Sequence, residues 1–410
     1  MNSLIYQARK SFGTSVYLWT SMPRLGPKAT EIKQQIQIPK GIPQKMEAFD
    51  KLNVKKLNIG LRHSAVITED GKLYTFGSGN WGPLGHGSEK DVKFDNPQLV
   101  EFFEKRNKKI VEVGLGEYHT AALTSDGEVY TWGYGGKQTL FNWMITQEVG
   151  GLGHGDKKHH FFPKKVDFFE KNNIKVSRIL AGLYHTIAIS DTGDLYTWGR
   201  GLFGVLGNAS NSYSLTPMLN DEFHIMKQEK PDLKIQKIDV ADEYTGALMN
   251  DGTLYVWGKN DRGQLGTGSG IGIDMIESEN VPIAITVLDK NDQPHLVKDF
   301  HPGQNTMIIR DDEDNIYKVG LKLDYSPKQV NIFNEEFKKE DVTQLSCGRK
   351  HYCVLNNQNK LMVWGNIFKE KPAAEADGFG LHYGDQLFDG GKIKELSLKY
   401  SIFGALVEHK

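Results

Sequence analysis

The sequence has few cysteines, no long apolar run and no excess of either charge. Cys347 and Cys353 are its two cysteines. If both lay in one extended strand, their spacing of six positions would hold them about 20 Å apart, which excludes a disulfide between them. The sequence therefore predicts two free thiols, as expected in a reducing compartment or in a protein that is indifferent to redox state.

The other absences exclude several classes of function. No apolar stretch reaches the roughly 18 residues that a membrane-spanning helix needs. Lys+Arg 50 against Asp+Glu 51 leave a net charge of -1, whereas direct nucleic-acid binding needs a concentrated basic face. The sequence also lacks a nucleophile elbow, a zincin motif and a phosphate-binding loop. We therefore expect no enzyme activity, no cofactor and no resident metal.

Acidic residues are absent from the first thirty positions, since the first is Glu31. Arg9 and Lys10 lie there beside apolar residues at helical spacing, among several Ser and Thr. This composition is typical of a mitochondrial targeting segment and also fits a basic N-terminal arm. We expect residues 1–13 to lie outside the fold and the protein to be mitochondrial, with the cytoplasm or nucleus as the alternative.

One segment of 15 residues recurs along the chain. Its clearest copy, His119–Gly133, has two short strands of β-branched, aromatic and small residues joined at Asp126-Gly127, which favours a tight hairpin turn. Successive copies place their terminal aromatic position 56, 66, 59, 62 and 45 residues apart, which is too long for a helix-pair repeat. The copies are His63–Gly77, His119–Gly133, His185–Gly199, Tyr244–Gly258, Thr306–Gly320 and His351–Gly365.

A glycine loop and a short segment led by proline follow each of the clear hairpins. In the first unit they are Gly82-Pro83-Leu84-Gly85 and Pro97–Val100. Since proline cannot donate to a β-ladder, the Pro-led segment belongs on an outer edge. Another apolar strand precedes each hairpin, which gives four strands per unit. Such units repeated radially form a β-propeller, so the sequence predicts an all-β fold.

The two ends of the chain supply a seventh unit. Residues 395–407 resemble the first two strands of a unit, and residues 16–42 resemble the other half, with Val16–Trp19 in the place of Val129–Trp132. Pairing 16–42 with 395–407 closes the ring and removes the exposed strand edges of an open one. We predict a single domain over residues 14–410, a seven-bladed β-propeller of four-stranded blades.

These units resemble the regulator-of-chromosome-condensation (RCC1-like) repeat family over residues 14–410. The resemblance rests on His or Tyr, Asp-Gly, Tyr-x-Trp-Gly and Gly-x-Leu-Gly in fixed order in the first four hairpins, and it weakens in the unit at 296–330, which lacks the glycine loop. It implies a seven-bladed propeller. The family's founder is the nuclear exchange factor for the GTPase Ran, so the resemblance also implies guanine-nucleotide exchange for a small GTPase.

Some repeated residues look like functional sites. Gly77–Gly82 and Gly199–Gly204 match the dinucleotide pattern G-x-G-x-x-G, but no amphipathic helix follows, so we interpret them as repeated turns. The histidines that begin four hairpins are expected between blades, bonded to backbone groups, rather than on a metal. They are His63, His119, His185 and His351. We expect His154, His159 and His160 to be loop residues and Asp311–Asp314 to be a solvated turn.

The largest departure from the repeat is an apolar insertion at 137–148. Phe76 to Gly87 spans 11 residues in the first unit, whereas Trp132 to Gly155 spans 23 in the second. Because aromatic and Met side chains dominate interface hot spots, we predict partner binding here, with folding back over the disc as the alternative. The predicted partner-binding residues are Leu140, Phe141, Trp143, Met144 and Ile145. Two further insertions, 267–281 and 366–392, should emerge from the same face.

Two functions are compatible with these features. The first is a non-catalytic scaffold or protein-interaction subunit, such as a structural or assembly component of a mitochondrial multiprotein complex. The second is guanine-nucleotide exchange, in which a protruding wedge would bind the nucleotide-free GTPase better than the loaded one. Both predict protein partners on the face that carries the insertions.

Overall fold

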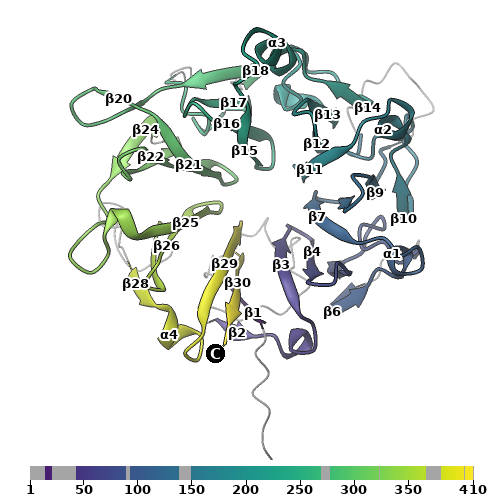
Figure 1. The fold of residues 1–410 in the computed structure, drawn as a ribbon, viewed down its shortest axis with the longest axis horizontal. Helices are drawn as coiled ribbons and strands as arrows, with labels where there is room; N and C mark the ends of the chain where they lie inside the picture. The colour runs from purple at the N-terminus through teal and green to yellow at the C-terminus, as the bar shows by residue number, and fades with distance from the viewer. Residues whose placement is uncertain are drawn as a thin grey trace, which may run out of the picture.

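The computed structural model describes residues 14–20, 43–88, 93–137, 149–268, 278–322, 324–365, 380–400 and 402–409. Within these residues, seven four-stranded antiparallel sheets stand around one axis, which Figure 1 shows end-on. The seven-bladed β-propeller predicted from the repeats is therefore confirmed. The fifth and sixth units, in which the repeat signature is weak, form complete blades as well.

Six blades follow the chain from the innermost strand to the outermost. The first three are β3 (Val54–Ile59), β4 (His63–Thr68), β5 (Leu73–Ser78) and β6 (Lys93–Leu99); β7 (Ile110–Leu115), β8 (His119–Thr124), β9 (Val129–Gly133) and β10 (His160–Lys165); and β11 (Val176–Ala181), β12 (His185–Ser190), β13 (Leu195–Gly199) and β14 (Ser214–Leu219). The next three are β15 (Ile235–Val240), β16 (Tyr244–Met249), β17 (Leu254–Lys259) and β18 (Ser278–Ile285); β21 (Val297–Pro302), β22 (Thr306–Asp311), β23 (Ile316–Gly320) and β24 (Asp324–Val330); and β25 (Val342–Cys347), β26 (His351–Asn356), β27 (Lys360–Gly365) and β28 (Gly380–Tyr383).

The seventh blade joins the two ends of the chain. Its strands, from the inside outward, are β29 (Lys392–Lys399), β30 (Ile402–Glu408), β1 (Thr14–Thr20) and β2 (Gln44–Lys45). Seven residue pairs join β1 to β30, from Thr14 opposite Glu408 to Thr20 opposite Ile402. The predicted ring closure is confirmed for residues 14–20. The Pro-led segment at 39–42 lies outside the described residues, and the outermost strand is Gln44–Lys45.

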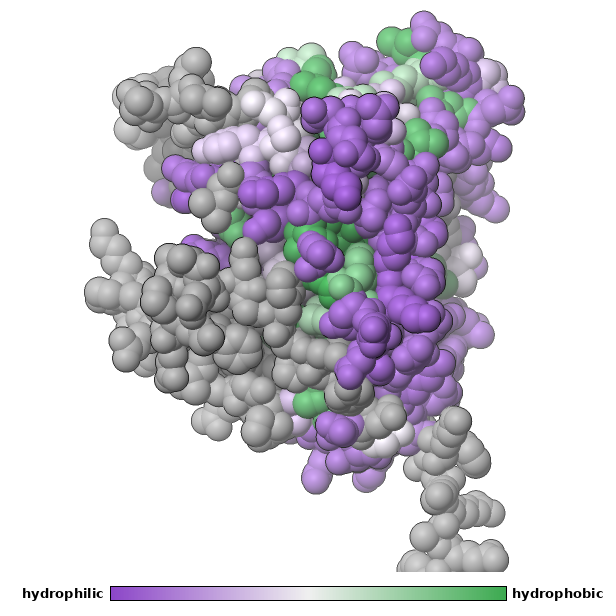
Figure 2. Space-filling model, turned by 90° about the vertical axis from the view of Figure 1, so that its left-hand side faces the viewer, coloured by the Kyte–Doolittle hydropathy of each residue, from purple (hydrophilic) through white to green (hydrophobic). Residues whose placement is uncertain are grey.

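The charged links between blades contain short helices that each bury one phenylalanine. They are α1 (Glu101–Glu104), α2 (Asp167–Lys171) and α3 (Asp221–Glu229), which bury Phe103, Phe169 and Phe223. A small pair of strands, β19 (Val287–Leu288) and β20 (Pro294–His295), follows the fourth blade, and α4 (Gly384–Leu387) follows the sixth. Figure 2 shows the outer edge of the ring on the side of the fifth and sixth blades, where hydrophilic residues dominate and hydrophobic ones form only small areas.

The hairpin turn between the second and third strands explains the recurring Asp-Gly. Gly127 has a φ of 84°, which glycine adopts without steric cost, while Asp126 keeps a negative φ. The turn therefore needs one left-handed residue, not two. In the fifth and sixth blades Asp314 and Asn359 take this position, with φ of 68° and 63°. Asp and Asn tolerate this conformation better than other side chains, so the turn survives where the signature decays.

The remaining signature residues join neighbouring blades. The Trp198 indole in the third blade donates from Nε1 to the carbonyl oxygen of Gly151 in the second, at 2.9 Å. A Cβ on Gly153, whose φ is 79°, would lie 2.7 Å from that same nitrogen. Trp132 and Trp257 make equivalent bonds to the preceding glycine loops. The Gly-x-Leu-Gly loop thus packs against the tryptophan of the next blade and accepts its hydrogen bond.

Changing Gly153 to alanine is expected to lower the free energy of unfolding by about 2 to 4 kcal/mol, from left-handed backbone strain and from overpacking against Trp198. Urea denaturation measures this loss. Gly193→Ala is the matched control, because its φ is 90° and nothing lies within 4 Å of its added Cβ. The control should lose only the strain, about 1 to 2 kcal/mol. Equal losses in the two variants would show that the close packing of Gly153 against Trp198 contributes nothing to the free energy of unfolding.

The cysteines are free, as predicted, but for a different reason. Cys347 ends β25 and Cys353 lies in the neighbouring strand β26, so they do not share one extended strand. Their side chains belong to different core clusters on opposite faces of the sheet. The expected separation along one strand was wrong, since a turn lies between the two residues. What keeps the two thiols apart is the alternation of side chains between the faces of a sheet.

Candidate functional site

Two kinds of turn share one face of the ring. Because the strands of a blade alternate in direction, the turn between the first and second strands lies on the same side as the turn between the third and fourth. The predicted insertions 137–148 and 267–281, and residues 366–379 of the predicted insertion 366–392, fall in the second kind of turn, so this side is named the insertion face. Residues 278–281 already belong to β18, and 380–387 form β28 and α4. The other turns and the links between blades lie on the opposite, connector face.

The predicted partner-binding residues lie outside the described residues. They are Leu140, Phe141, Trp143, Met144 and Ile145. The structure does describe the two ends of their insertion, where a β-bridge joins Gly136 to Val149 and the Gly150 amide donates to the carbonyl oxygen of Gly135 at 3.1 Å. Val149 is 1% exposed. The insertion therefore begins and ends at a fixed root on the second blade.

Next to this root, aromatic rings from the first three blades form a continuous arc. The Tyr134 ring stacks on the His159 imidazole with centroids 5.0 Å apart. The Trp81 ring lies 5.0 Å from His159 and 5.5 Å from Tyr134. Tyr118 continues the arc towards the ring axis, 6.2 Å from Tyr134 and 6.4 Å from Tyr184. These five residues are named the aromatic arc.

Trp81 is the most exposed ring of the arc, at 48%. Its φ is 69°, a rare conformation for a bulky side chain, and strain of this kind clusters at functional sites. It lies in the Gly77–Gly82 segment, after which no α-helix appears in the described residues up to Ser88. That segment is therefore a repeated turn, as interpreted from the sequence, and it presents an aromatic ring to solvent.

His159 is fixed beneath Trp81. Its Nδ1 accepts a hydrogen bond from the Gly135 amide at 3.1 Å. Burial lowers the pKa of His159, so the ring is uncharged at neutral pH and packs as an aromatic side chain. The sequence suggested only a loop residue here, because nothing in its pattern showed that Trp81, from the preceding blade, reaches this position.

Glu117 holds the inner end of the arc. Arg62 donates to its Oε1 from Nε and Nη2 at 2.9 and 2.7 Å, and the Arg62 guanidinium also lies 4.5 Å from the centroid of the Tyr118 ring. The Tyr184 hydroxyl donates to Oε2 of Glu117. Burial, followed by this hydrogen bond, raises the pKa of Tyr184 well above its usual value. The arginine, the glutamate and the tyrosine come from three successive blades, so the contact fixes their turns relative to one another.

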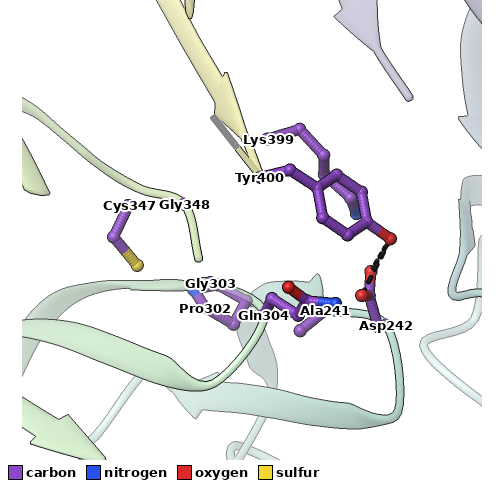
Figure 3. A pocket seen from close by; sticks show the side chains of 9 residues that line it. All are labelled: Ala241, Asp242, Pro302, Gly303, Gln304, Cys347, Gly348, Lys399 and Tyr400. Carbon is purple, nitrogen blue, oxygen red and sulfur yellow. Dashed lines mark hydrogen bonds between the residues drawn. The ribbon is translucent and has the colours of Figure 1, made fainter. Parts of the chain in front are cut away.

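A hydrogen bond between distant blades lies at the ring axis. Tyr400 of the seventh blade donates to both carboxylate oxygens of Asp242 of the fourth, at 2.8 Å each, although the two residues are 158 apart in sequence. Figure 3 shows this pair beside Gln304, Cys347 and Lys399, around a cavity of about 10 Å³. That is close to the smallest space that holds one water molecule. The cavity therefore has no room for an organic ligand.

Three titratable side chains around this cavity have pKa values that burial raises, which favours their neutral forms. The Cys347 thiol donates to the carbonyl oxygen of His301 at 3.1 Å, and burial raises its pKa far above the usual range, so it is protonated. Burial likewise raises the pKa of Asp242 and that of Tyr400. The groups at the ring axis therefore hold blades together.

Two hairpin histidines, His63 and His119, lie between blades, as expected, but each is hydrogen-bonded to a side chain rather than to a backbone group. His63 Nε2 is 2.7 Å from the Thr120 hydroxyl of the next blade, and His119 Nε2 is 3.1 Å from that of Thr186. Burial lowers the pKa of His63 and of His185 to about 3, and that of His119 to about 4. These imidazoles are therefore neutral at physiological pH.

The acidic run at Asp311–Asp314 is less solvated than predicted. Asp311 is fully buried, and its carboxylate accepts hydrogen bonds from Asn315 and from the Tyr317 hydroxyl. Asp311 and Asp312 also form, with His295, the one group among the described residues whose atoms are spaced for a metal ion. Because the Asp311 oxygens already accept from protein donors, this group is a hydrogen-bonded turn of the connector face.

A closed ring of seven four-stranded blades, joined by the signature tryptophans and with an aromatic surface on one face, defines this chain as a repeat β-propeller. The RCC1-like domain matches residues 15–366. The chain belongs to this family, as the resemblance of its repeats suggested.

The repeats of this chain are similar to segments of proteins that differ from one another in length and activity. The chain is 30% identical to the ultraviolet-B receptor UVR8 of Arabidopsis thaliana over 230 residues, which are 56% of this chain and 47% of the receptor. It is 32% identical over 234 residues to the E3 ubiquitin-protein ligase HERC2 of Homo sapiens, which are 56% of this chain and 4% of the ligase. The match therefore covers less than half the length of either relative.

Solved structures share the complete ring. Prp20p from Saccharomyces cerevisiae superimposes with a TM-score of 0.73 at 16% identity, over 98% of this chain and 92% of that one. Human WBSCR16 superimposes with a TM-score of 0.69 at 17% identity, over 97% and 99% of the two chains. At such identity the likeness shows the fold alone. None of the helices in the described residues has the length and hydropathy of a membrane span.

Proposed function

We propose that this protein is a non-catalytic propeller that binds protein partners through its insertion face. The observation that carries the proposal is the aromatic arc, which runs from turns near the ring axis to the root of the apolar insertion. Aromatic side chains carry much of the binding energy in protein interfaces. Trp81, with about half its surface exposed, offers apolar area whose burial by a partner is favourable.

We propose that the insertion extends this surface. Its ends are fixed beside Tyr134, so its side chains are tethered next to the arc. The partner-binding residues of the insertion are Leu140, Phe141, Trp143, Met144 and Ile145. Together with the arc they would supply the aromatic and Met anchors typical of an interface core.

Changing Phe141 and Trp143 together to serine should release the partner without unfolding the ring. The loss is expected because two hot-spot aromatics cost about 2 kcal/mol or more each when truncated. Co-purification from native cells and a thermal melt of the isolated protein measure the two effects. Ile225→Ser with Leu296→Ser is the matched control. These two apolar side chains are 49% and 54% exposed, and they lie on the connector face. A double mutant that kept every partner would refute the site.

We infer further that the partner assembly is mitochondrial. The acid-poor, hydroxyl-rich first thirty residues support this location. Imaging of the protein tagged at its C-terminus, combined with native gel electrophoresis of purified mitochondria, tests the inference. A protein found only in the cytoplasm or nucleus would contradict the location while leaving the insertion face as the binding surface.

Guanine-nucleotide exchange predicts a different partner behaviour. Prp20p has been studied for its binding to Gsp1p and histones, but at 16% identity none of its binding residues transfers to this chain. An exchange factor would hold one small GTPase in a complex that added GDP or GTP dissociates. A nucleotide-insensitive assembly supports the scaffold, and a nucleotide-sensitive one would replace it with exchange.

A further inference from the structure

The insertion face has a second part, which is basic. On the fourth to seventh blades, the turns and strand ends of this face carry five basic side chains, apart from Lys259, which is paired with Glu243. They are Arg262, Lys322, Arg349, Lys350 and Lys399, named here the basic arc. The aromatic arc occupies the first three blades, so the two arcs lie on different sides of the ring axis.

Backbone hydrogen bonds show that the turns of the basic arc are neighbours. The Lys322 amide donates to the carbonyl oxygen of Arg262 at 2.9 Å, which joins the fifth blade to the fourth. The Gln304 amide donates to Gly348, and the Arg349 amide donates to Tyr400 at 2.8 Å, which joins the fifth, sixth and seventh blades. The five cations therefore follow one another around the ring.

These cations have little acidic compensation. Lys322, Arg349 and Lys350 are exposed and form no ion pair with any described residue. Arg262 has only Asp261, at 3.7 Å. Lys399 lies near Asp242, whose carboxylate is already engaged by Tyr400. Like charges held close together repel one another, and an acidic partner would relieve that repulsion.

Two described acids of this face that lie between the aromatic and basic arcs are already paired. Glu117 is bound to Arg62 at 2.7 Å, and Glu243 to Lys259 at 2.7 Å. The described turns of the fifth to seventh blades on this face, at 303–305, 321–322, 348–350 and 400, contain no acidic residue. In a chain whose net charge is -1, the basic arc is thus a local excess of positive charge.

We propose that the basic arc binds an acidic segment of the protein partner, whose apolar part lies on the aromatic arc. This inference rests on the proposed function and names the chemistry of the partner. A protein segment fits better than nucleic acid, because the basic arc has five cations among the described residues and Asp242 and Glu243 border them. Phosphate backbones need a longer basic track.

The test uses the full chain and a fluorescein-labelled oligo-glutamate peptide, with binding measured by fluorescence anisotropy at low salt and at about 150 mM salt. The arc variant is Arg349→Glu with Lys350→Glu. The control carries the same charge change on the connector face, Lys51→Glu with Lys338→Glu. The unaltered protein should bind the peptide in a salt-sensitive manner. The arc variant should bind about tenfold more weakly or worse, and the control should match the unaltered protein.

Three results would overturn the proposal. They are equal binding by the arc variant and the control, no binding of the peptide by the unaltered protein, and tighter binding of a labelled DNA duplex than of the peptide. Residues 366–379 carry Glu370, Glu375 and Asp377, so a variant with these acids changed to amides is measured too. An arc occupied by this segment would leave the unaltered protein without peptide binding and let the amide variant bind the peptide, which is the second of these results.

The outcome is separable from that of the proposed function. If Phe141→Ser with Trp143→Ser releases the cellular partner while charge reversal changes nothing, the insertion face stands and the acidic segment is wrong. If charge reversal abolishes peptide binding while the serine variant keeps every partner, the basic arc stands and the site on the insertion is wrong.

Discussion

Deleting residues 14–42 is expected to abolish the compact monomer. The deletion removes β1, which seven residue pairs join to β30, and leaves β30 as an open edge. It also removes Val16, Tyr17 and Leu18, which are buried. Each contributes about 1.5 to 3 kcal/mol on burial, so their sum is comparable with the whole stability of a typical domain, about 5 to 15 kcal/mol.

Size-exclusion chromatography and a thermal melt monitored by circular dichroism measure the effect. We expect the truncated chain to be expanded or aggregated and to lack the cooperative transition of the full chain. Deleting residues 1–13 is the control, since it leaves all four strands of the seventh blade intact. A 14–42 deletion with an unchanged melting transition would refute closure by the termini.

Mild acid is expected to unfold the ring, because buried histidines must take up protons on unfolding. The folded-state pKa is about 3 for His63 and His185 and about 4 for His119, whereas an exposed histidine titrates near pH 6.5. Between these values the unfolded state binds more protons, so stability is full above about pH 6.5 and falls as pH decreases. Each histidine costs about 1.4 kcal/mol per pH unit in this window, and three cost about 4.

Urea denaturation at a series of pH values from about 7 to 4.5 measures this loss. Asp242 and Glu395, whose pKa values burial raises, act in the opposite direction, so a variant is needed to isolate one histidine. His119→Gln keeps a polar group opposite Thr186 and removes one titrating ring. The free energy of unfolding of this variant should fall less steeply with decreasing pH. The difference in slope corresponds to about one proton fewer taken up on unfolding. An identical slope in the variant would show that His119 is not kept neutral by the fold.

The blades could be predicted from the sequence because each one repeats the same short sequence pattern, which is called here the local code. His119–Gly133 contains both strands of a hairpin and its turn, and the position of Trp132 recurs 45 to 66 residues apart along the chain. The closing blade could be predicted by the same code, since Val16–Trp19 is a copy of a known strand. The blade interfaces were only half predicted: the code marked His119 as buried between blades but did not show that its partner is the Thr186 hydroxyl.

The binding surface could not be predicted in the same way, because it depends on contacts between repeats. Tyr118 and Tyr184 occupy the same position, just before the hairpin histidine, and an alignment of the units would have shown an aromatic residue at this position in neighbouring blades. Trp81 and His159 occupy unrelated positions. The Tyr400–Asp242 bond joins residues 158 apart, and no local pattern links them. Repeats predict which residues are buried, whereas the surface depends on residues that differ between repeats.

The pairing of Thr14 with Glu408 determines which face of the propeller lies next to a tether at the chain termini. Thr14 and Glu408 both lie at the connector face of this blade, and Figure 1 shows the C-terminus beside β1 and β2. A tether attached at either end therefore points the aromatic and basic arcs away from its anchor. Immobilised through a terminal tag, the protein would offer its whole insertion face to solution. In a larger assembly, the same geometry would let the connector face be tethered while the insertion face binds a partner.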